Sequence, residues 1–356
     1  MKLQRIETDL LRYRLAKPVG GSGVNFVDVL IVELALDNGV AGLGFSYVLS
    51  ESGVVAAAAC KALASRLQTV DFHHPAASWR FLNGTLNRTG FGPNAIALAA
   101  IDVALWDAYA KSLGQPLGCV LGGSPRVVNV YASGGYFAGQ SADEVCAVSQ
   151  EWAAQGFKAV KPRVDGSLRA IAALRSLRES LPADIEVMCD ANEKCSMAQA
   201  QRLLHAAQEL GVLFVEEPLP ANDRDGYMAL ARTYPGRIAA GEHMQGIEQC
   251  LPWVTGAACG TFQPDLAMIG GLTPALELAR IADAFGVEIA PHFLPGLFVH
   301  LAAACPNVAW LEDFPLIEPM FTGWPAVVQG RLQMTQASGH GLALGQGAKE
   351  TFVLQR

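Results

Sequence analysis

The chain has 356 residues, of which 51% are hydrophobic and 17% are charged, and its formal net charge is −7. This length is sufficient for one large domain or two ordinary ones with a sizeable core. An acidic chain without a basic stripe is not typical of a nucleic-acid-binding protein. No unbroken apolar run is long enough to cross a bilayer, and the charged N-terminus lacks the apolar core of a secretory signal. We therefore expect a cytoplasmic globular protein with no membrane or nucleic-acid partner.

The cysteines are scattered along the chain and form neither a CxxC motif nor a His/Cys pattern of metal-ligand spacing. Several lie in apolar runs, which is typical of buried thiols in a reducing cytoplasm. The eight are Cys60, Cys119, Cys146, Cys189, Cys195, Cys250, Cys259 and Cys305.

The first part of the chain differs in pattern from the rest. Residues 1–50 alternate apolar and polar side chains as strands do, and the sequence DNG at 37–39 predicts a hairpin turn. Residues 53–113 are helical in pattern and contain Ala-rich stretches.

From about residue 128, short apolar runs alternate with amphipathic helices. Ser141 and Glu144 have the spacing of a capping box, and Gly156 ends that helix before the next apolar run. Eight such runs follow, and the polar residues that end successive runs from Arg163 to Glu312 are 20 to 27 residues apart. One strand, one helix and two loops take about this length, so the pattern predicts a parallel (β/α)₈ barrel. A doubly wound sheet also alternates in this way, but it ordinarily carries a glycine-rich phosphate turn, which is not found here.

Three successive runs end in a carboxylate: Asp190 in MCDAN, Glu216 in FVEEP and Glu242 in AAGEH. One such residue alone is more often a cap or a surface charge. In a barrel, however, all three meet at one end, where they would repel one another unless a cation neutralised them. Oxygen ligands suit Mg²⁺, or Mn²⁺ as a substitute, and zinc is disfavoured because no His or Cys cluster accompanies the three.

His292 in APHF and Asp265 in QPDLAMIGG end two neighbouring runs. A carboxylate that accepts from an imidazole fixes the tautomer and raises the basicity of the ring, as a general base requires. The remaining histidines lack such a partner, and we interpret them as structural or surface residues. They are His73, His74, His205, His300 and His340, while the direction of His243 beside Glu242 stays open between substrate contact and packing.

In the run AVKPRV, Lys161 and Arg163 are two residues apart, so both side chains point to one face of the strand. One interpretation is a solvated edge strand that is protected by its charges and its proline. Beside a metal site, two cations would instead bind an anion.

These motifs together resemble the enolase superfamily, and within it the mandelate racemase subgroup. The resemblance covers essentially the whole chain. It includes the segment 95–123, followed by VKPR, DAN, EEP, GEH, PDLAMIGG, PHF and WLED in this order.

The resemblance implies abstraction of the proton α to a carboxylate, with the enediolate held on Mg²⁺. It implies that Asp190, Glu216 and Glu242 are the metal ligands and that His292 and Asp265 are the catalytic dyad. It also implies that Glu312 hydrogen-bonds the substrate carboxylate, either in its protonated form or by way of a strong shared proton, and that Asn192 contacts a substrate hydroxyl.

The resemblance further implies a capping domain at 1–125, a barrel at 126–319 and a C-terminal segment at 320–356 that returns to the cap. The loop 16–26, with three glycines, is either a lid over the barrel mouth or a plain hairpin turn. A homo-oligomer is expected from the resemblance and from the apolar composition.

The run AVKPRV departs from the pattern of the subgroup, which usually has Lys-x-Lys at this place with the second lysine as a base. Arg163 takes that position, and arginine does not deprotonate in proteins. We therefore predict chemistry with His292 as one base, while Lys161 and Arg163 neutralise the substrate anion and Lys161 is the alternative second base. Dehydration of an acid sugar to a 2-keto-3-deoxy acid is the main hypothesis. The alternatives are an epimerase or a sugar-lactone or anhydro-acid cycloisomerase, and a catalytically idle binding protein.

Overall fold

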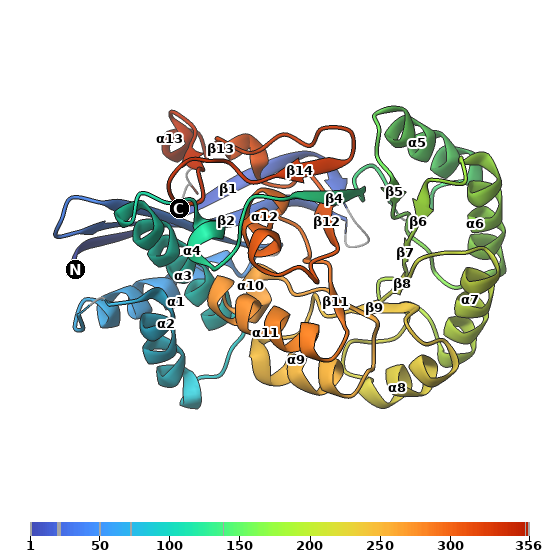
Figure 1. Cartoon of the computed structure of the whole chain (residues 1–356), viewed down its shortest axis with the longest axis horizontal. Coiled ribbons are helices and arrows are strands. Elements are labelled where there is room, and N and C mark those ends of the chain that lie inside the picture. Colours follow the sequence, from blue (N-terminus) through green and yellow to red (C-terminus); the bar gives the residue numbers. More distant parts are fainter. Residues whose placement is uncertain are drawn as a thin grey trace.

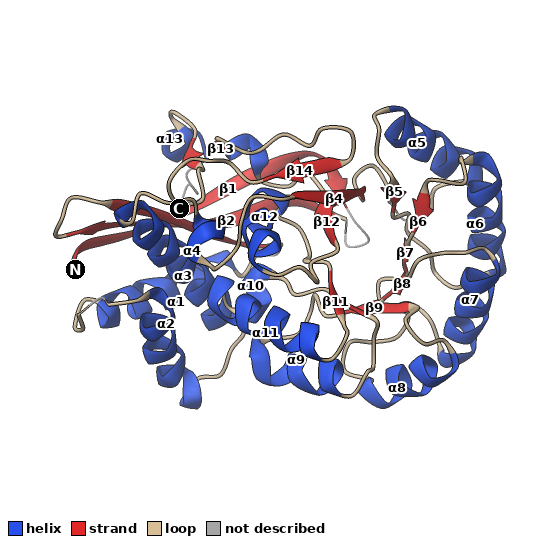
Figure 2. Ribbon diagram, in the orientation of Figure 1, coloured by secondary structure: helices blue, strands red, loops and turns tan. Residues whose placement is uncertain are grey.

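The computed structural model describes residues 2–19, 23–49, 51–71, 73–137, 139–352 and 354. Figure 1 shows two parts: an N-terminal sheet with its helices, and a ring of short strands that is surrounded by helices. We call the first part the cap and the second the barrel. Figure 2 shows that strands form the inner side of the ring and helices its outer side.

The cap contains an antiparallel sheet in the order β1–β2–β3, formed by β1 (Leu3–Val19), β2 (Val24–Leu36) and β3 (Ala41–Val48). Gly39 in the predicted DNG turn has a φ of +82°, which glycine tolerates, and the predicted hairpin is confirmed. Helix α3 packs directly on β3, because a Cβ at Gly42 or Gly44 would collide with the α3 backbone. The cap helices are α1 (Gly53–Leu67), α2 (Pro75–Gly84), η1 (Thr85–Arg88), α3 (Pro93–Ser112) and α4 (Leu117–Val120).

The predicted parallel barrel is confirmed in the described part of the chain. Parallel pairing runs along β12–β4–β5–β6 and along β7–β8–β9–β10–β11, and β6 and β7 are separated only by Met188. A bridge from Ile289 to Val308 joins β11 to the last strand and closes the ring. The strands are β4 (Val127–Ala132), β5 (Ala159–Val160), β6 (Glu186–Val187), β7 (Cys189–Asp190), β8 (Val215–Glu216), β9 (Ile238–Ala240), β10 (Thr261–Phe262), β11 (Glu288–Ile289) and β12 (Trp310–Asp313).

The helices between these strands begin at the sites that the sequence marks. Ser141 and Glu144 form the predicted capping box, and Ser196 and Gln199 form another. The helices are α5 (Ala142–Ala154), α6 (Leu168–Ser180), α7 (Met197–Glu209), α8 (Arg224–Thr233), α9 (Gly246–Thr255), α10 (Leu266–Ile269), α11 (Leu272–Ala284) and α12 (Pro295–Ala304). The eighth unit differs from a regular (β/α)₈ barrel, because β12 is followed by the short 3₁₀ helix η2 (Glu318–Met320) within the described residues.

The C-terminal segment contacts both parts of the molecule. Strand β14 (Arg331–Gln333) pairs antiparallel with β4 of the barrel. Helix α13 (Ala348–Phe352) packs on β1 of the cap, where Lys349 forms an ion pair of 2.9 Å with Asp9. Two further strands, β13 (Phe321–Thr322) and β15 (Ala343–Leu344), pair with each other. The domain boundaries near residues 125 and 320 stay predictions.

Part of the predicted lid lies outside the described residues, namely 20–22. On either side of it, β1 and β2 pair as a hairpin as far as Val19 and Val24. Whether this hairpin is a lid stays a prediction.

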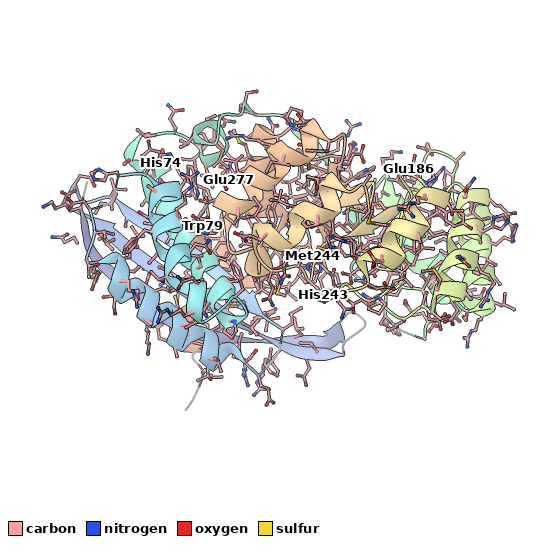
Figure 3. All side chains as sticks on the ribbon, turned by 90° about the horizontal axis from the view of Figure 1, so that it is seen from below. His74, Trp79, Glu186, His243, Met244 and Glu277 are labelled. Carbon is pink, nitrogen blue, oxygen red and sulfur yellow. The ribbon has the colours of Figure 1, made fainter. Side chains whose placement is uncertain are left out.

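The cap and the barrel are joined by buried hydrogen bonds between α3 and α11. Asp102 accepts from the backbone and hydroxyl of Thr273 at 2.8 and 2.7 Å, and Trp106 donates to the same hydroxyl at 2.9 Å. Next to them, Trp79 donates to the carbonyl of Gly270 at 2.7 Å (Figure 3). Together these bonds fix the cap to the outer side of the barrel.

The cysteines are free thiols: six are buried, and Cys119 and Cys146 are half-buried. None of the helices in the described ranges is long and apolar enough to cross a membrane.

Two buried histidines hold the C-terminal segment between the cap and the barrel. His300 accepts from the backbone of Gly118 at its Nδ1, 3.1 Å away, so its Nε2 donates to the carbonyl of His340 at 3.1 Å. His340 accepts from Leu342 at 3.0 Å and donates to the carbonyl of Leu43 at 2.7 Å. Both rings are therefore neutral, and the interpretation of His300 and His340 as structural residues agrees with these contacts.

This arrangement predicts loss of stability in acid. Burial lowers the pKa of His300 to about 4, although its bond to the carbonyl of His340 opposes the shift. Below the unfolded pKa of about 6.5, the unfolded chain binds a proton that the folded chain does not. Stability therefore falls as the pH drops from 6.5 toward 4, with a contribution from His300 of about 2 kcal/mol between pH 7 and pH 5.

The measurement is urea unfolding of the wild type and of His300→Asn at pH 7 and pH 5. Asparagine retains an acceptor for Gly118 but does not titrate, so the variant should be less stable at pH 7 and lose less stability on acidification. His205→Asn, at an exposed histidine, is the control. An equal pH dependence of wild type and His300→Asn would contradict the prediction.

Candidate active site at the carboxyl ends of the barrel strands

The polar residues predicted to end the strands meet at the carboxyl end of the barrel. Each lies at, or within three residues of, the last residue of its strand, and all are largely buried. Figure 3 shows His243 at the same end of the barrel as the tip of the β1–β2 sheet. The residues concerned are Lys161, Arg163, Asp190, Glu216, Glu242, Asp265, His292 and Glu312.

Lys161 is a fully buried cation between two carboxylates. Its side chain is 0% exposed, and Nζ lies 2.5 Å from Oε2 of Glu216 and 2.9 Å from Oε1 of Glu312. Burial lowers the pKa of Lys161, but the charges of Glu216 and Glu312 outweigh burial and raise it. The interpretation of this run as a solvated edge strand is therefore wrong.

Arg163 projects from the same strand end and forms an ion pair with Asp190. Its Nη2 also lies 3.5 Å from the hydroxyl of Ser133. Asn192 donates its backbone N–H and its side-chain amide to Asp190 at 2.8 and 2.9 Å. The described contacts of Asn192 are thus with Asp190, and its contact with a substrate hydroxyl stays a prediction.

The carboxylates of Glu216 and Glu242 are also paired with cations. Glu216 accepts from Lys161 and, at 2.8 Å, from the amide of Gln263, and burial raises its pKa. Glu242 lies 3.1 Å from Nε2 of His292 and 3.5 Å from Nε2 of His243. Burial raises the pKa of Glu242, but these two histidines and Lys161 outweigh it and lower the value.

The three predicted metal ligands fit a hard divalent cation in their chemistry. Asp190 and Glu216 are paired residues of adjacent strands, and Glu242 follows the next strand. Oε1 of Glu216 is buried and has no hydrogen-bond partner within the described part of the chain. An unpartnered buried carboxylate oxygen is unfavourable unless a cation binds it. In this structure Arg163, Lys161 and His292 supply the positive charge.

The dyad of His292 and Asp265 is present as predicted. Nδ1 of His292 lies 2.9 Å from Oδ2 of Asp265. Asp265 caps α10, because its Oδ1 accepts from the backbone of Ala267 and Met268 at 2.8 and 3.0 Å. Asp265 therefore orients the ring through Nδ1, and Nε2 faces Glu242 at 3.1 Å.

The hydroxyl of Tyr47 donates to the same oxygen of Asp265. Tyr47 lies on β3 of the cap, 218 residues away in sequence, and sequence reasoning missed it. The segment GFSYV gives no sign of this contact beyond its strand pattern.

The ring of His292 is surrounded by carboxylates, and they shift its pKa. Burial lowers its pKa, but Glu242, Asp265 and Glu312 together outweigh burial and raise the value to about 9. Phe293 stacks on the ring at a centroid distance of 3.6 Å and fixes its plane. The ring is therefore protonated near neutral pH in the metal-free protein.

Glu312 differs from the expected protonated form. Its Oε2 accepts from the backbone of Phe293 at 3.1 Å, and its Oε1 lies against Lys161. Burial raises the pKa of Glu312, but Lys161, His292 and Arg163 outweigh it and lower the value to about 2. Glu312 is therefore ionised in this structure. The sequence did not show that Lys161 would lie beside it.

A second acidic group lies next to the predicted metal ligands. Glu193, Glu217 and His243 each offer a ligand atom, and these atoms all lie within 4.8 Å of one another. This contact places His243, whose direction the sequence left open, beside Glu193 and Glu217. Glu193 and Glu217 were missed, although each follows a predicted ligand, because both adopt a positive φ that turns the chain.

The comparisons with known proteins agree with this geometry. Residues 18–122 match the model described as "Mandelate racemase / muconate lactonizing enzyme, N-terminal domain", and residues 144–348 match "Enolase C-terminal domain-like". The chain belongs to this enolase-superfamily family. It is therefore an enzyme of the mandelate racemase subgroup.

The similar proteins within the family catalyse more than one reaction. An L-talarate/galactarate dehydratase from Salmonella typhimurium is 29% identical over 98% of this chain and 90% of the relative. A D-galactarolactone cycloisomerase from Agrobacterium fabrum is 31% identical over 90% of this chain and 86% of the relative. An L-talarate dehydratase structure from Polaromonas sp. JS666, complexed with Mg and L-glucarate, has a TM-score of 0.92 at 29% identity and covers 99% of this chain and 98% of its own.

The dyad gives a prediction for the metal-free protein. Asp265→Asn removes a carboxylate that raises the pKa of His292, so we expect this pKa to fall from about 9 toward the ordinary value near 6.5. Asparagine also caps helices, so α10 should be retained. The measurement is an NMR titration of the His292 ring.

Tyr47→Phe is the matched control, since it removes a partner of Asp265 but leaves the carboxylate in place. The pKa of His292 should not fall in this variant. An unchanged pKa in Asp265→Asn would show that the dyad does not set the basicity of His292.

Proposed function

We propose that the protein dehydrates an acid sugar to a 2-keto-3-deoxy acid by abstracting the proton α to its carboxylate. The observation that carries this proposal is that the site has one imidazole and that an arginine stands where a second base would be needed. Nε2 of His292 faces the carboxylates, while Arg163 takes the place of a second base and is paired with Asp190. The dehydratases of acid sugars among the relatives support the choice of reaction.

Asp190, Glu216 and Glu242 would hold Mg²⁺, as similar structures described with bound magnesium suggest. When bound, the ion supplies positive charge that stabilises an enediolate. Binding would release Arg163, Lys161 and His292 from these carboxylates.

The released side chains have distinct roles in the reaction. Nε2 of His292 takes the α-proton, and Asp265 stabilises the imidazolium that forms. His292 then gives this proton to the hydroxyl that leaves from the β-carbon, so that water is expelled and the enol product tautomerises to the keto acid. Lys161 and Arg163 neutralise the substrate carboxylate, and Glu312 hydrogen-bonds that group by way of a shared proton. Asn192 contacts a substrate hydroxyl.

An isomerase is the second candidate. A single base also suffices for ring opening of a lactone or anhydro acid, and the cycloisomerase relative at 31% identity supports this alternative. Among the described residues, the paired dyad and the carboxylates form a site that an idle binding protein would not need.

The test is proton NMR in D₂O with Mg²⁺ and a panel of aldonic, uronic and aldaric acids and their lactones. We expect loss of the α-proton signal and new methylene signals at C3 for at least one acid. Isomerisation without loss of water would favour the second candidate. No turnover and no α-proton exchange in the presence of bound Mg²⁺ would contradict both.

The assigned base is tested with His292→Asn, for which we expect turnover and α-proton exchange to fall roughly 10²–10⁴-fold. His205→Asn, on the exposed side of α7, is the matched control and should retain full activity. Substantial α-proton exchange in His292→Asn would show that another group is the base.

The role of Arg163 is tested with Arg163→Lys, which places a titratable amine on the face opposite His292. We expect dehydration to fall by about tenfold, or about 1.4 kcal/mol. We also expect the variant to exchange the α-proton and to form the epimer at the α-carbon, because lysine can act as a base on the second face. NMR of both epimers in D₂O measures this, and unchanged rate and stereochemistry would disprove the role.

A further inference from the structure

We propose that Glu193, Glu217 and His243 form a second divalent-cation site, which takes a borderline ion such as Zn²⁺ and is distinct from the predicted Mg²⁺ site. The three come from the loops after β7, β8 and β9. Those are the strands whose ends carry Asp190, Glu216 and Glu242. Glu217 and His243 directly follow Glu216 and Glu242 in the chain, and Glu193 comes three residues after Asp190.

The distances suit direct coordination of one ion. Nδ1 of His243 lies 3.1 Å from Oε1 of Glu217 and 3.2 Å from Oε1 of Glu193. With bonds of about 2.1 Å, two ligand atoms of a tetrahedral Zn²⁺ are about 3.4 Å apart. Small side-chain movements would bring all three atoms to this spacing.

Glu217 gives an independent sign of a missing ligand. Its side chain is 1% exposed, and its Oε2 has no hydrogen-bond partner among the residues that the structure describes. His243 contacts only Oε1 of this carboxylate, so the buried Oε2 is left without the partner that a bound cation would supply. Glu193, by contrast, is part-exposed and also accepts from the backbone of Ala221 at 3.1 Å.

The charge and the ligand types favour a borderline ion. Two carboxylates and a neutral imidazole carry a charge of −2, which one divalent cation balances. Imidazole suits Zn²⁺ and similar ions, whereas Mg²⁺ prefers oxygen ligands and retains its waters. The side chain of His243 is 51% exposed (Figure 3), so water can fill the open coordination position. The same exposure gives the ion an entry path.

The test counts the zinc that the full chain binds. Chelator-treated protein is dialysed against Zn²⁺ with a large excess of Mg²⁺, and zinc is measured by mass spectrometry. We expect one Zn²⁺ per wild-type chain. His243→Asn and Glu193→Gln should each weaken zinc binding by more than about tenfold. Circular dichroism checks that each variant folds. Because Glu193 lies in a part-exposed loop, we expect Glu193→Gln to disturb the fold least.

Two controls separate this site from others. His205→Asn removes an exposed histidine that lies 3.4 Å from Glu209, and zinc binding should be unchanged. Glu216→Gln removes a predicted Mg²⁺ ligand and should also retain zinc. Because the readout is bound metal, the result does not depend on turnover.

Three results would overturn the proposal. They are no zinc retained against Mg²⁺, equal zinc binding by His243→Asn and the wild type, or loss of zinc in Glu216→Gln. With Co²⁺ in place of zinc, wild-type protein should show visible absorption that His243→Asn lacks. Identical spectra would also count against it.

Discussion

The charge balance at the carboxyl ends of the barrel strands is the constraint on which the site depends. Beside the group of Glu193, Glu217 and His243, five further carboxylates lie there against the cations Lys161, Arg163 and protonated His292. The five are Asp190, Glu216, Glu242, Asp265 and Glu312. Five negative and three positive charges leave a net charge of −2, in surroundings that are largely buried. One divalent cation balances this charge, so the carboxylates can remain together without strong mutual repulsion. In the proposed function, the cations that the metal would release are available for an anionic substrate.

The cap completes this site, although most of the polar residues come from the barrel. Tyr47 on β3 donates to Asp265, the same carboxylate that orients His292. Its position depends on the close packing of α3 against Gly42 and Gly44, and on the buried bonds of Asp102 to Thr273. A movement of the cap relative to the barrel would therefore change the environment of the base directly.

The sequence predicted the features that depend on chain period. Strands of a parallel barrel end on one side, so their terminal residues could be assigned from spacing alone, and Lys161 and Arg163 share a face because they are two residues apart. The 3₁₀ helix in place of a regular eighth helix was not predicted, because the period of the apolar runs indicates strands and carries no information about the segment after the last strand.

The features that sequence could not predict depend on contacts between distant segments. Tyr47 and Asp265 are 218 residues apart, and no local pattern connects them. The ionised state of Glu312 follows from its contact with Lys161, whose burial between two carboxylates is a tertiary feature. The positions of Glu193 and Glu217 depend on the positive φ of their turns. A positive φ is uncommon outside glycine, and these residues give no sign of it in the sequence.

Arg163 links the charge balance to the choice of reaction. A lysine at this position could lose its proton once a metal balanced Asp190, and it would then face the substrate opposite His292 as a second base. Arginine stays charged under the same conditions, so it can neutralise but cannot accept a proton. Its guanidinium also pairs with Asp190, so a cation that binds this carboxylate must displace Arg163. In the proposed reaction, the arginine thus removes the second base, and this favours chemistry on one face of the α-carbon.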